Sequence, residues 1–205
     1  MFLNCEIWKN KIALFATLLR RVDCTVKIKS HDSFKHKMVE LKARVSDHEL
    51  LRKRLAALGA EPLGIFQQSD LYFKVPEGRL KLREVEANNT IELIYYDREN
   101  IAGPKSDDVF ILQVQEPGEL KKILKKILTP LIVIVKVREI FIYCGIQIHL
   151  DTLEKLGKFI EFEKQTDDNP EAIEKGRLFL QKLMKKLEID QNNLESLSYS
   201  DLLQA

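Results

Sequence analysis

Hydrophobic and polar residues alternate along most of the chain after residue 37, which is the periodicity of β-strands. Short segments rich in Gly, Pro and Asn separate the alternating runs, as expected for connections between strands. We predict strands at 38–45, 63–75, 79–85, 90–98, 108–115, 131–143, 146–151 and 158–165. Most connections are short enough for antiparallel pairing. We therefore predict an α+β fold with a closed, antiparallel, eight-stranded β-barrel, because closure leaves no exposed sheet edge.

Three other segments carry the signals of helices. Ser46 offers an N-cap, and Glu49 three residues later completes a capping box. Pro117 and Pro170 each fit the first turn of a helix. Leu and Ile repeat at helical spacing in these segments, so each helix should bury one face against the outside of the barrel. The expected helices cover 46–59, 117–128 and 169–187.

Charged residues on several of these strands lie on a single face. In the segment GRLKLRE at 78–84, the side chains of Arg79, Lys81 and Arg83 point one way, and those of Leu80 and Leu82 point the other way. The charged faces of the other strands carry Glu40, Lys42, Arg44, Lys136, Arg138, Gln147, His149, Asp151, Glu161 and Glu163. The opposite faces are aliphatic and suit the apolar stripes of the helices. We therefore favour charged faces inside the barrel. The alternative is an exposed sheet face on which these charges form weak surface salt bridges.

A lumen with many cations and a few carboxylates would suit a polyphosphate. Arg binds phosphate in a fork geometry, and Lys acts as a point charge. Carboxylates such as Glu40, Glu161 and Glu163 supply the oxygen ligands that Mg²⁺ and Mn²⁺ prefer. A metal held there would stabilise the charge that develops during phosphoryl transfer. Without a ligand, Lys81 and Arg83 are expected to face like charges.

Composition excludes several other classes of protein. The chain has 205 residues, a net charge of +2 and 45% hydrophobic residues. This charge provides no global field for nucleic acid. Tyr72, Phe73, Tyr95 and Tyr96 give a little of the aromatic pattern of a single-strand binding face, but aromatic residues on strands usually belong to the core, and the carboxylates would repel phosphate without a metal. Cys5, Cys24 and Cys144 are too widely spaced for a zinc motif and indicate reduced thiols. No apolar run approaches the roughly 20 residues of a membrane span.

The first 37 residues differ from the rest of the chain. The apolar run IALFATLL at 12–19 has basic residues on both sides, loosely like a targeting peptide, but Glu6 and Asp23 weaken that interpretation. We expect an N-terminal extension of unassigned role at 1–37, one catalytic or binding domain at 38–205, and a cytoplasmic protein. Targeting to an organelle through residues 1–37 is the alternative.

Several motifs in order resemble one known family. VELKARV, GRLKLRE, VKVRE, IHLDTLEKLGKFIEFE and SYSDLL resemble successive motifs of the CYTH superfamily, the triphosphate tunnel metalloenzymes. The branch of class IV adenylate cyclases is the most similar. The resemblance covers about four-fifths of the chain. It implies a tunnel open at both ends that binds triphosphate compounds with Mg²⁺ or Mn²⁺.

The resemblance also implies roles for individual residues. Lys42 and Asp151 would be catalytic, and Glu40, Glu161 and Glu163 would hold the metal. Lys105, in an expected loop, would close over one mouth of the tunnel. The residues expected to bind phosphate are Lys42, Arg44, Lys81, Arg83, Arg98, Lys136 and Arg138. His149 is interpreted as a lining or structural residue rather than a base.

Two positions depart from the family pattern. Met38 replaces the first glutamate of the opening motif, which puts the number of bound metals in doubt. Gln147 stands where relatives often carry a basic residue. The loss of this positive charge is expected to weaken substrate binding.

The resemblance leaves the reaction open. Members of the family cyclise ATP or hydrolyse thiamine triphosphate or inorganic triphosphate. The residues expected to bind phosphate do not distinguish these substrates. A non-catalytic phosphate-binding module is the alternative function. The expected partner is one of these small molecules, not nucleic acid or membrane, and the chain is expected to be a monomer or homodimer.

Overall fold

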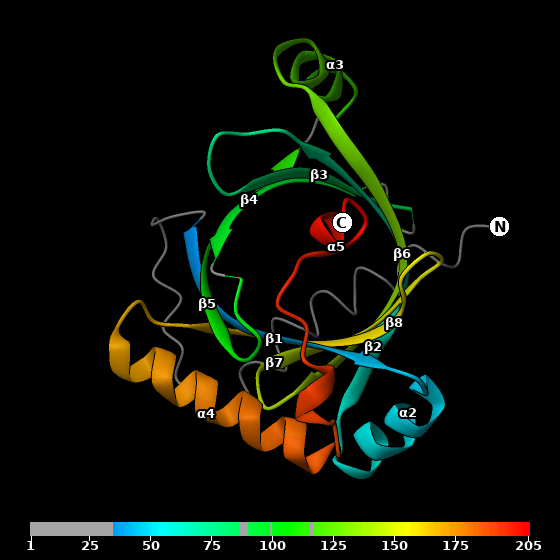
Figure 1. The fold of residues 1–205 in the computed structure, drawn as a ribbon, viewed down its shortest axis with the longest axis vertical. Helices are drawn as coiled ribbons and strands as arrows, with labels where there is room; N and C mark the ends of the chain where they lie inside the picture. The colour runs from blue at the N-terminus through cyan, green and yellow to red at the C-terminus, as the bar shows by residue number, and fades with distance from the viewer. Residues whose placement is uncertain (1–34, 87–89, 99, 115–116) are drawn as a thin grey trace, which may run out of the picture. The chain divides into compact units, whose positions relative to one another are not determined.

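The computed structural model describes residues 35–86, 90–98, 100–114 and 117–205 and contains a closed β-barrel. Its strands follow the order β1-β5-β4-β3-β2-β6-β7-β8 around the ring, and every neighbouring pair is antiparallel (Figure 1). The strands are β1 (Lys35–Val45), β2 (Glu61–Phe73), β3 (Arg79–Val85), β4 (Thr90–Arg98), β5 (Lys105–Val114), β6 (Pro130–Tyr143), β7 (Ile146–Leu153) and β8 (Gly157–Thr166). The predicted fold class is confirmed.

Residues 1–34 lie outside the described residues, and with them the apolar run considered as a targeting signal. The first described strand, β1, begins at Lys35, three residues before the expected start of the domain. The boundary between an extension at 1–37 and a domain at 38–205 stays a prediction.

Two helices cover the outer face of β1. They are α2 (His48–Ala57) and α4 (Pro170–Lys186), and α4 lies along the barrel wall in Figure 1. The outward residues Val39, Leu41 and Ala43 of β1 are fully buried beneath them, because strand alternation places every second side chain on that side. The core there includes Val39, Leu41, Ala43, Leu51, Leu55, Leu180 and Leu183. No described helix has the length and apolar character that crossing a membrane requires.

A third helix, α3 (Pro117–Ile127), covers a different part of the barrel wall. Leu124 on α3 packs with Leu71 of β2 and Leu82 of β3. The outer face of β6 differs, since Val133 and Val135 are each 53% exposed. The expectation that helices cover the aliphatic strand faces therefore holds on β1, β2 and β3 but not along this part of β6.

The start of α2 corrects a sequence prediction. The N-cap is Asp47, whose carboxylate accepts hydrogen bonds from the backbone amides of Glu49 and Leu50, at 2.8 and 3.1 Å. Ser46 was expected in that role. The shift by one residue leaves Glu49 in the first turn, where a negative side chain favours the helix dipole.

The start of β5 corrects another prediction. The strand begins at Lys105, in the segment expected to be a loop, and not at residue 108. Strand alternation then brings Lys105 and Asp107 to the inner face of the barrel, and both side chains are 1% exposed. Lys105 is therefore part of the wall and not a loop residue that closes over a mouth.

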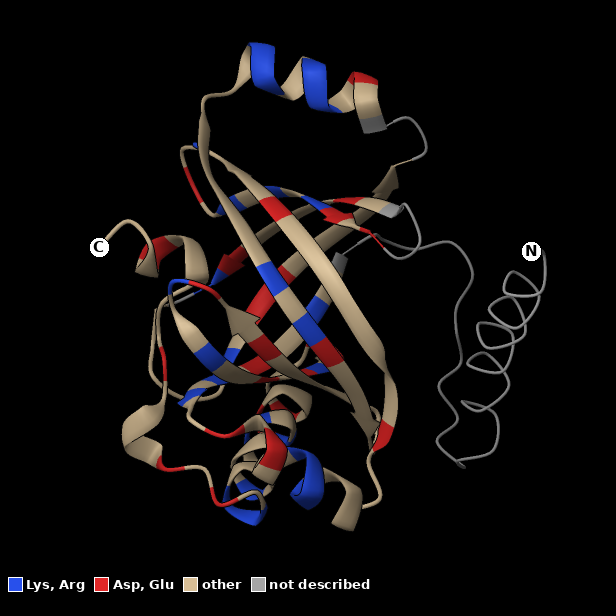
Figure 2. Ribbon diagram, turned by 90° about the vertical axis from the view of Figure 1, so that its right-hand side faces the viewer, with Lys and Arg blue, Asp and Glu red and all other residues tan. Residues whose placement is uncertain are grey.

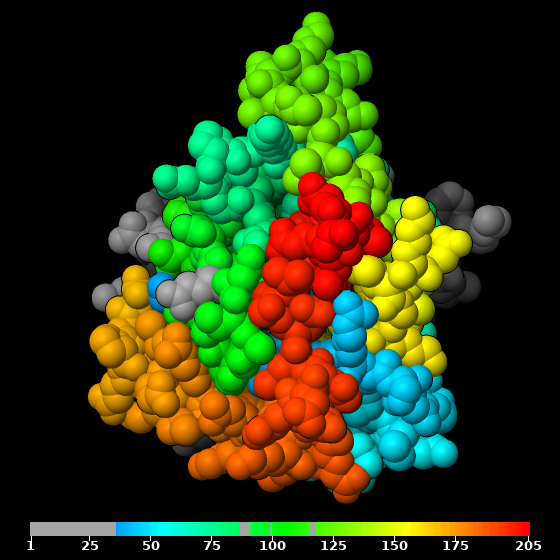
Figure 3. All heavy atoms as spheres, in the orientation of Figure 1, coloured from blue at the N-terminus to red at the C-terminus, as the bar shows by residue number. Residues whose placement is uncertain are grey.

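The C-terminal segment runs across one mouth of the barrel. After α4 come a short 3₁₀ turn, η1 (Gln191–Asn193), and the helix α5 (Tyr199–Leu202), which lies over the centre of the ring in Figure 1. Tyr199 packs with Phe159 and Ile134 in an apolar cluster. Figure 3 shows that the C-terminal residues fill this face of the barrel. The resemblance implied a tunnel open at both ends; here, packing of the C-terminal segment covers one of them.

Candidate active site

Most of the predicted site residues line one cavity inside the barrel, with a volume of about 100 Å³. Charged residues lie along the strands that enclose it (Figure 2). The predicted residues in its lining are Glu40, Lys42, Lys81, Arg83, Arg98, Lys136, Arg138, Glu161 and Glu163. Arg44 and Asp151 are not in the lining. Arg44 binds Glu195 at 3.1 Å and has a 45% exposed side chain, whereas Asp151 is fully buried.

Asp70 on β2 holds three of the cations. Its carboxylate lies 3.0 Å from the Lys81 amine, 2.8 Å from the Arg83 guanidinium and 3.6 Å from the Lys136 amine. Burial alone would raise the pKa of Asp70, but attraction to Arg83, Lys81 and Lys136 outweighs burial and holds that pKa well below its usual range. Asp70 is therefore an anion that gathers the three cations.

The two lysines of this group are less basic than ordinary lysines. Burial and repulsion from Arg138 lower the pKa of Lys136 to about 7. Burial and repulsion from Arg83 lower the pKa of Lys81 to about 8. Both amines therefore change charge near neutral pH.

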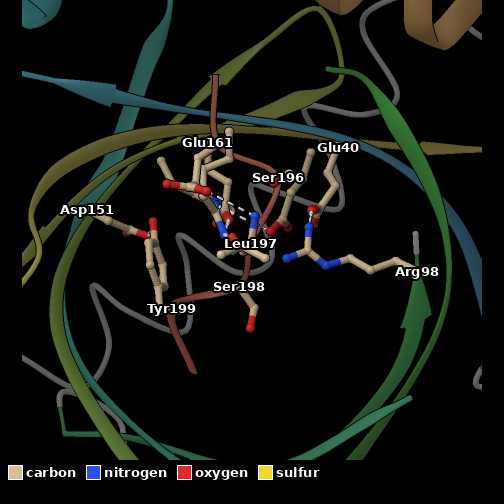
Figure 4. A network of polar contacts seen from close by, with 12 residues as sticks. Glu40, Arg98, Asp151, Glu161, Ser196, Leu197, Ser198 and Tyr199 are labelled. Atoms are coloured by element: carbon tan, nitrogen blue, oxygen red, sulfur yellow. Dashed lines mark hydrogen bonds and ion pairs between the residues drawn. The ribbon is translucent and has the colours of Figure 1, made fainter. Parts of the chain in front are cut away.

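A second group surrounds Arg138 of β6. Its guanidinium donates to Asp151 at 2.7 and 2.6 Å and to Glu161 at 2.6 Å. The Tyr199 hydroxyl donates to the same Asp151 carboxylate at 2.9 Å (Figure 4). Burial would raise the pKa of Asp151, but the neighbouring Arg138 and Lys136 lower it to about 2. Asp151 is thus a buried anion that fixes the orientation of Arg138.

A third group lies where β1, β4 and β5 meet. Arg98 pairs with the Glu40 carboxylate, and the Lys105 amine lies 3.4 Å from the same carboxylate. Figure 4 shows the Glu40 and Arg98 side chains pointing toward each other. Asp107 adds a second carboxyl group, and burial together with the adjacent Glu40 raises the pKa of Asp107 to about 9.

One cluster has the donor atoms of a metal site. The His149 Nδ1 atom lies 3.7 Å from a Glu161 oxygen and 3.6 Å from a Glu163 oxygen. His149 Nε2 lies 3.1 Å from the Gln147 side-chain oxygen, and this contact places the ring proton on Nε2. Nδ1 is then a lone-pair donor facing two carboxylates, with no hydrogen-bond partner among the described residues. Carboxylate and imidazole donors fit Mn²⁺, and the two carboxylates fit Mg²⁺.

This cluster bears on the predictions for several residues. Glu161 and Glu163, both expected as metal ligands, come together, whereas Glu40 is turned toward Arg98. His149, expected as a lining residue, offers the third donor atom. Gln147, expected to weaken substrate binding through the loss of a cation, contacts the His149 ring through its side-chain oxygen.

The C-terminal segment contributes to the same cavity. The Lys42 amine contacts the Leu197 carbonyl at 3.4 Å and the Glu161 carboxylate at 3.1 Å, and it lies 4.1 Å from the centre of the Tyr199 ring. The Lys105 amine donates to the Ser196 carbonyl at 3.2 Å. Two lumen cations are therefore held by backbone oxygens from the far end of the chain.

Sequence reasoning missed two acidic residues of the lumen. Asp70 lies within a run that was correctly predicted as a strand, and its alternation with Gln68 and Tyr72 was the available signal. Asp107 was placed before the expected strand, so its inward direction could not be assigned. Arg98, which was expected to bind phosphate, has a side chain that is only 2% exposed.

A family comparison agrees with this geometry. Residues 36–199 match the model of the CYTH domain. The chain belongs to the CYTH domain family. The resemblance to the CYTH superfamily that the sequence motifs indicated is confirmed. The match covers all eight barrel strands except the first residue of β1.

Individual relatives of this CYTH domain share its length. A Methanocaldococcus jannaschii protein named "Putative adenylate cyclase" is 25% identical over 180 residues, which cover 80% of this chain and 97% of that protein. The solved structure of a Pyrococcus horikoshii protein has a TM-score of 0.72 at 24% identity and covers 80% of this chain and 98% of its own.

A third similar protein comes from Hippeastrum. Its structure has a TM-score of 0.57 at 17% identity and covers 82% of this CYTH domain chain and 95% of its own. That protein is described as an adenylyl cyclase candidate with a dominant triphosphatase activity. At this identity the similarity shows a shared fold.

Proposed function

We propose that this CYTH domain protein is a metal-dependent enzyme that acts on triphosphate compounds. The observation that carries the proposal is the convergence of six cationic side chains from four strands on one cavity. They are Lys42, Lys81, Arg83, Arg98, Lys136 and Arg138. Burying so many charges is costly unless each has a counter-charge, and a triphosphate supplies several anionic oxygens in one molecule.

Binding would exchange carboxylates for phosphate oxygens. In the structure, Asp70 satisfies Lys81, Arg83 and Lys136, and Glu40 satisfies Arg98. Phosphate oxygens can take over these contacts because Arg and Lys bind both kinds of anion with similar geometry. The carboxylates thus keep the lysine and arginine side chains charged and in position to bind the ligand.

His149, Glu161 and Glu163 would hold Mg²⁺ or Mn²⁺. Such an ion, when bound, supplies positive charge beside the reacting phosphate and lowers the pKa of bound water. Among the chain's own groups, Gln147 keeps the His149 proton on Nε2 and so keeps Nδ1 available as a donor. Arg138 contacts Glu161 at 2.6 Å, so a cation that would bind phosphate lies directly beside residues that would hold the metal.

The two residues predicted as catalytic take different roles in this proposal. Lys42 lies between Glu161 and the Tyr199 ring at the edge of the cavity, where its amine can hold a phosphate oxygen next to the metal ligands. Asp151 acts through Arg138 and Tyr199 and is a positioning residue, since it does not line the cavity.

The reaction is either cyclisation or hydrolysis of the triphosphate. The name of the Methanocaldococcus jannaschii relative favours an adenylate cyclase, and the activity described for the Hippeastrum protein favours a triphosphatase. Cyclisation needs the ribose 3′-hydroxyl aligned on the α-phosphate, and hydrolysis needs a water aligned on the terminal phosphate. ATP, thiamine triphosphate and inorganic triphosphate are the substrates to compare.

The test incubates the purified protein with each of these three compounds and with Mg²⁺ or Mn²⁺, and identifies the products by chromatography. We expect metal-dependent product from at least one compound. Glu161→Gln should reduce turnover by at least about 100-fold, because loss of a ligand costs metal affinity or activity on this scale or more. Glu119→Gln, an exposed change on α3, is the matched control and should leave turnover unchanged. Tight triphosphate binding without turnover would identify a non-catalytic phosphate-binding module instead.

A further inference from the structure

A strip of apolar side chains is exposed on the outer wall of the barrel. Val133 and Val135 on the outer face of β6 are each 53% exposed, and Leu131 and Val137 on the same face are 44% and 41% exposed. Figure 2 looks onto this part of the wall, and no described helix lies in front of its strands. Large contiguous apolar patches are rare on monomeric proteins and mark interaction surfaces.

The strip continues beyond β6 at both ends. At one end lies Ile127, the last residue of α3, which is 69% exposed and precedes Leu131 by four residues. At the other end lies Ile65 of β2, which is 67% exposed and is a diagonal cross-strand neighbour of Val137. The exposed apolar surface therefore runs from the end of α3, along β6, to the first half of β2.

The orientation of α3 brings Ile127 to this strip. Leu124 of α3 packs on the barrel, so Lys121 and Ile127, three residues before and after it, lie on opposite flanks of the helix. Lys121 pairs with Glu84 of β3. In the ring of strands, β3 lies on one side of β2 and β6 lies on the other. The flank with Ile127 therefore faces β6.

The two ends of the strip carry opposite charges. At the α3 end, Lys126 is exposed and forms no ion pair within the described part of the chain. At the other end, Gln67, the cross-strand partner of Val137, donates to the Glu86 carboxylate at 3.1 Å and holds it on the outer face. Among the same described residues, Glu86 has no cationic partner. An apolar centre with opposite charges at its ends is complementary to a copy of itself turned by 180°, whereas an anionic membrane would attract Lys126 but repel Glu86.

We infer that this strip is the interface of a homodimer, in which the outer faces of two β6 strands pack against each other about a two-fold axis. The axis passes between Val133 and Val135, so Val133 of one copy meets Val135 of the second copy. Lys126 then approaches Glu86 of the second copy, and symmetry forms this pair twice. Two sheet faces pack in this way about 10 Å apart, with aliphatic side chains between them. The inference does not depend on the proposed activity.

The same axis gives a partner to each remaining apolar residue of the strip. Leu131 meets Val137 of the second copy, and Ile127 meets Ile65. The contact is isologous, because each of these pairs occurs twice with the roles of the copies exchanged. Its centre holds only aliphatic side chains and its charges lie at the rim, which is the usual composition of homodimer interfaces.

The test measures the mass of the full chain in solution by sedimentation equilibrium over a range of protein concentrations. We expect wild type to reach the mass of two chains. Val133→Lys should keep the mass of one chain, because the dimer would bury two lysines beside the axis without a counter-charge. The matched control is Leu178→Lys on α4, where the native side chain is 46% exposed and lies away from the strip, and this variant should remain a dimer.

A charge exchange at the rim tests the orientation of the two copies and keeps the proposal testable if Val133→Lys does not fold. Lys126→Glu should raise the dissociation constant of the dimer about tenfold, because it places two like-charged pairs at the interface. Glu86→Lys in the Lys126→Glu background should restore the wild-type constant. A wild type with the mass of one chain at every concentration, or a dimer that neither Val133→Lys nor Lys126→Glu weakens, would overturn the proposal. Binding of a monomeric wild type to vesicles of anionic lipid would assign the strip to a membrane surface and would overturn the dimer as well.

Discussion

At the scale of single residues, the lumen is organised by pairs of opposite charge. The sequence suggested that Lys81 and Arg83 would face like charges in the absence of a ligand. Asp70 lies between them instead, and neither the spacing of the cations nor the composition reveals that contact. The identity of the cations could be predicted from strand alternation. Their partners depend on which strands are adjacent in the ring, as β2 is to β3 and β6.

Removal of the Asp70 charge should be strongly destabilising. Asp70→Asn leaves Lys81, Arg83 and Lys136 buried without their shared anion. The free energy of unfolding should fall by about 3–5 kcal/mol, as is typical when one partner of a buried ion pair is removed. Denaturant unfolding measures this loss. Saturating triphosphate should recover part of it by supplying negative charge, and a loss below about 1 kcal/mol would show that Asp70 does not organise the cradle.

The depressed pKa of Lys136 predicts a specific pH dependence of binding. As the pH rises through about 7, the Lys136 amine of the free protein loses its proton and its charge. A bound anion requires that charge, so binding takes up a proton, and affinity falls with rising pH by up to about tenfold per unit for this one group. Calorimetric titration with tripolyphosphate between pH 6.5 and 8.5 measures the slope.

The matched variant for this pH dependence is Lys136→Arg, which keeps its charge over the whole range. The titration of tripolyphosphate itself is common to both proteins and cancels in the comparison. We expect a shallower slope for Lys136→Arg. Equal slopes for the two proteins would mean that Lys136 is not part of the binding site.

At the scale of secondary-structure elements, the eight strands and three main helices could be predicted, but some boundaries could not. Alternation identified each strand because one face is aliphatic and the other face meets the polar lumen. The start of β5 was placed three residues late, since Lys105 and Asp107 are polar and no local signal shows that they face inward. Because of this error, Asp107 was left out of the predicted site residues.

The corrected N-cap of α2 can be tested directly. Asp47→Ala removes the acceptor for the amides of Glu49 and Leu50 and should lower the melting temperature by about 3 °C, a typical effect of losing an N-cap. Ser46→Ala is the matched control and should cause no measurable shift. The reverse order of effects in a thermal melt would restore Ser46 as the cap.

At the scale of the whole barrel, the described residues form a wall with aliphatic packing outside and ion pairs inside. The alternation of charged and aliphatic residues along the strands predicted this arrangement, and the closed ring of strands confirms the predicted fold. The covered mouth could not be predicted, because it depends on where the last dozen residues pack. Tyr199 links the segment that covers the mouth to the ion pairs of the lumen, since its ring packs in the apolar cluster and its hydroxyl donates to Asp151.

The most direct test of the central claim is calorimetric titration of the metal-free protein with phosphate, pyrophosphate and tripolyphosphate in the presence of a chelator. If the lumen is a triphosphate cradle, affinity should rise steeply along this series, because each added phosphate meets further cations among Lys81, Arg83, Lys136 and Arg138. Arg83→Gln should reduce the affinity for tripolyphosphate more than the affinities for phosphate and pyrophosphate. Equal affinities for all three anions, or no binding of any, would contradict the account.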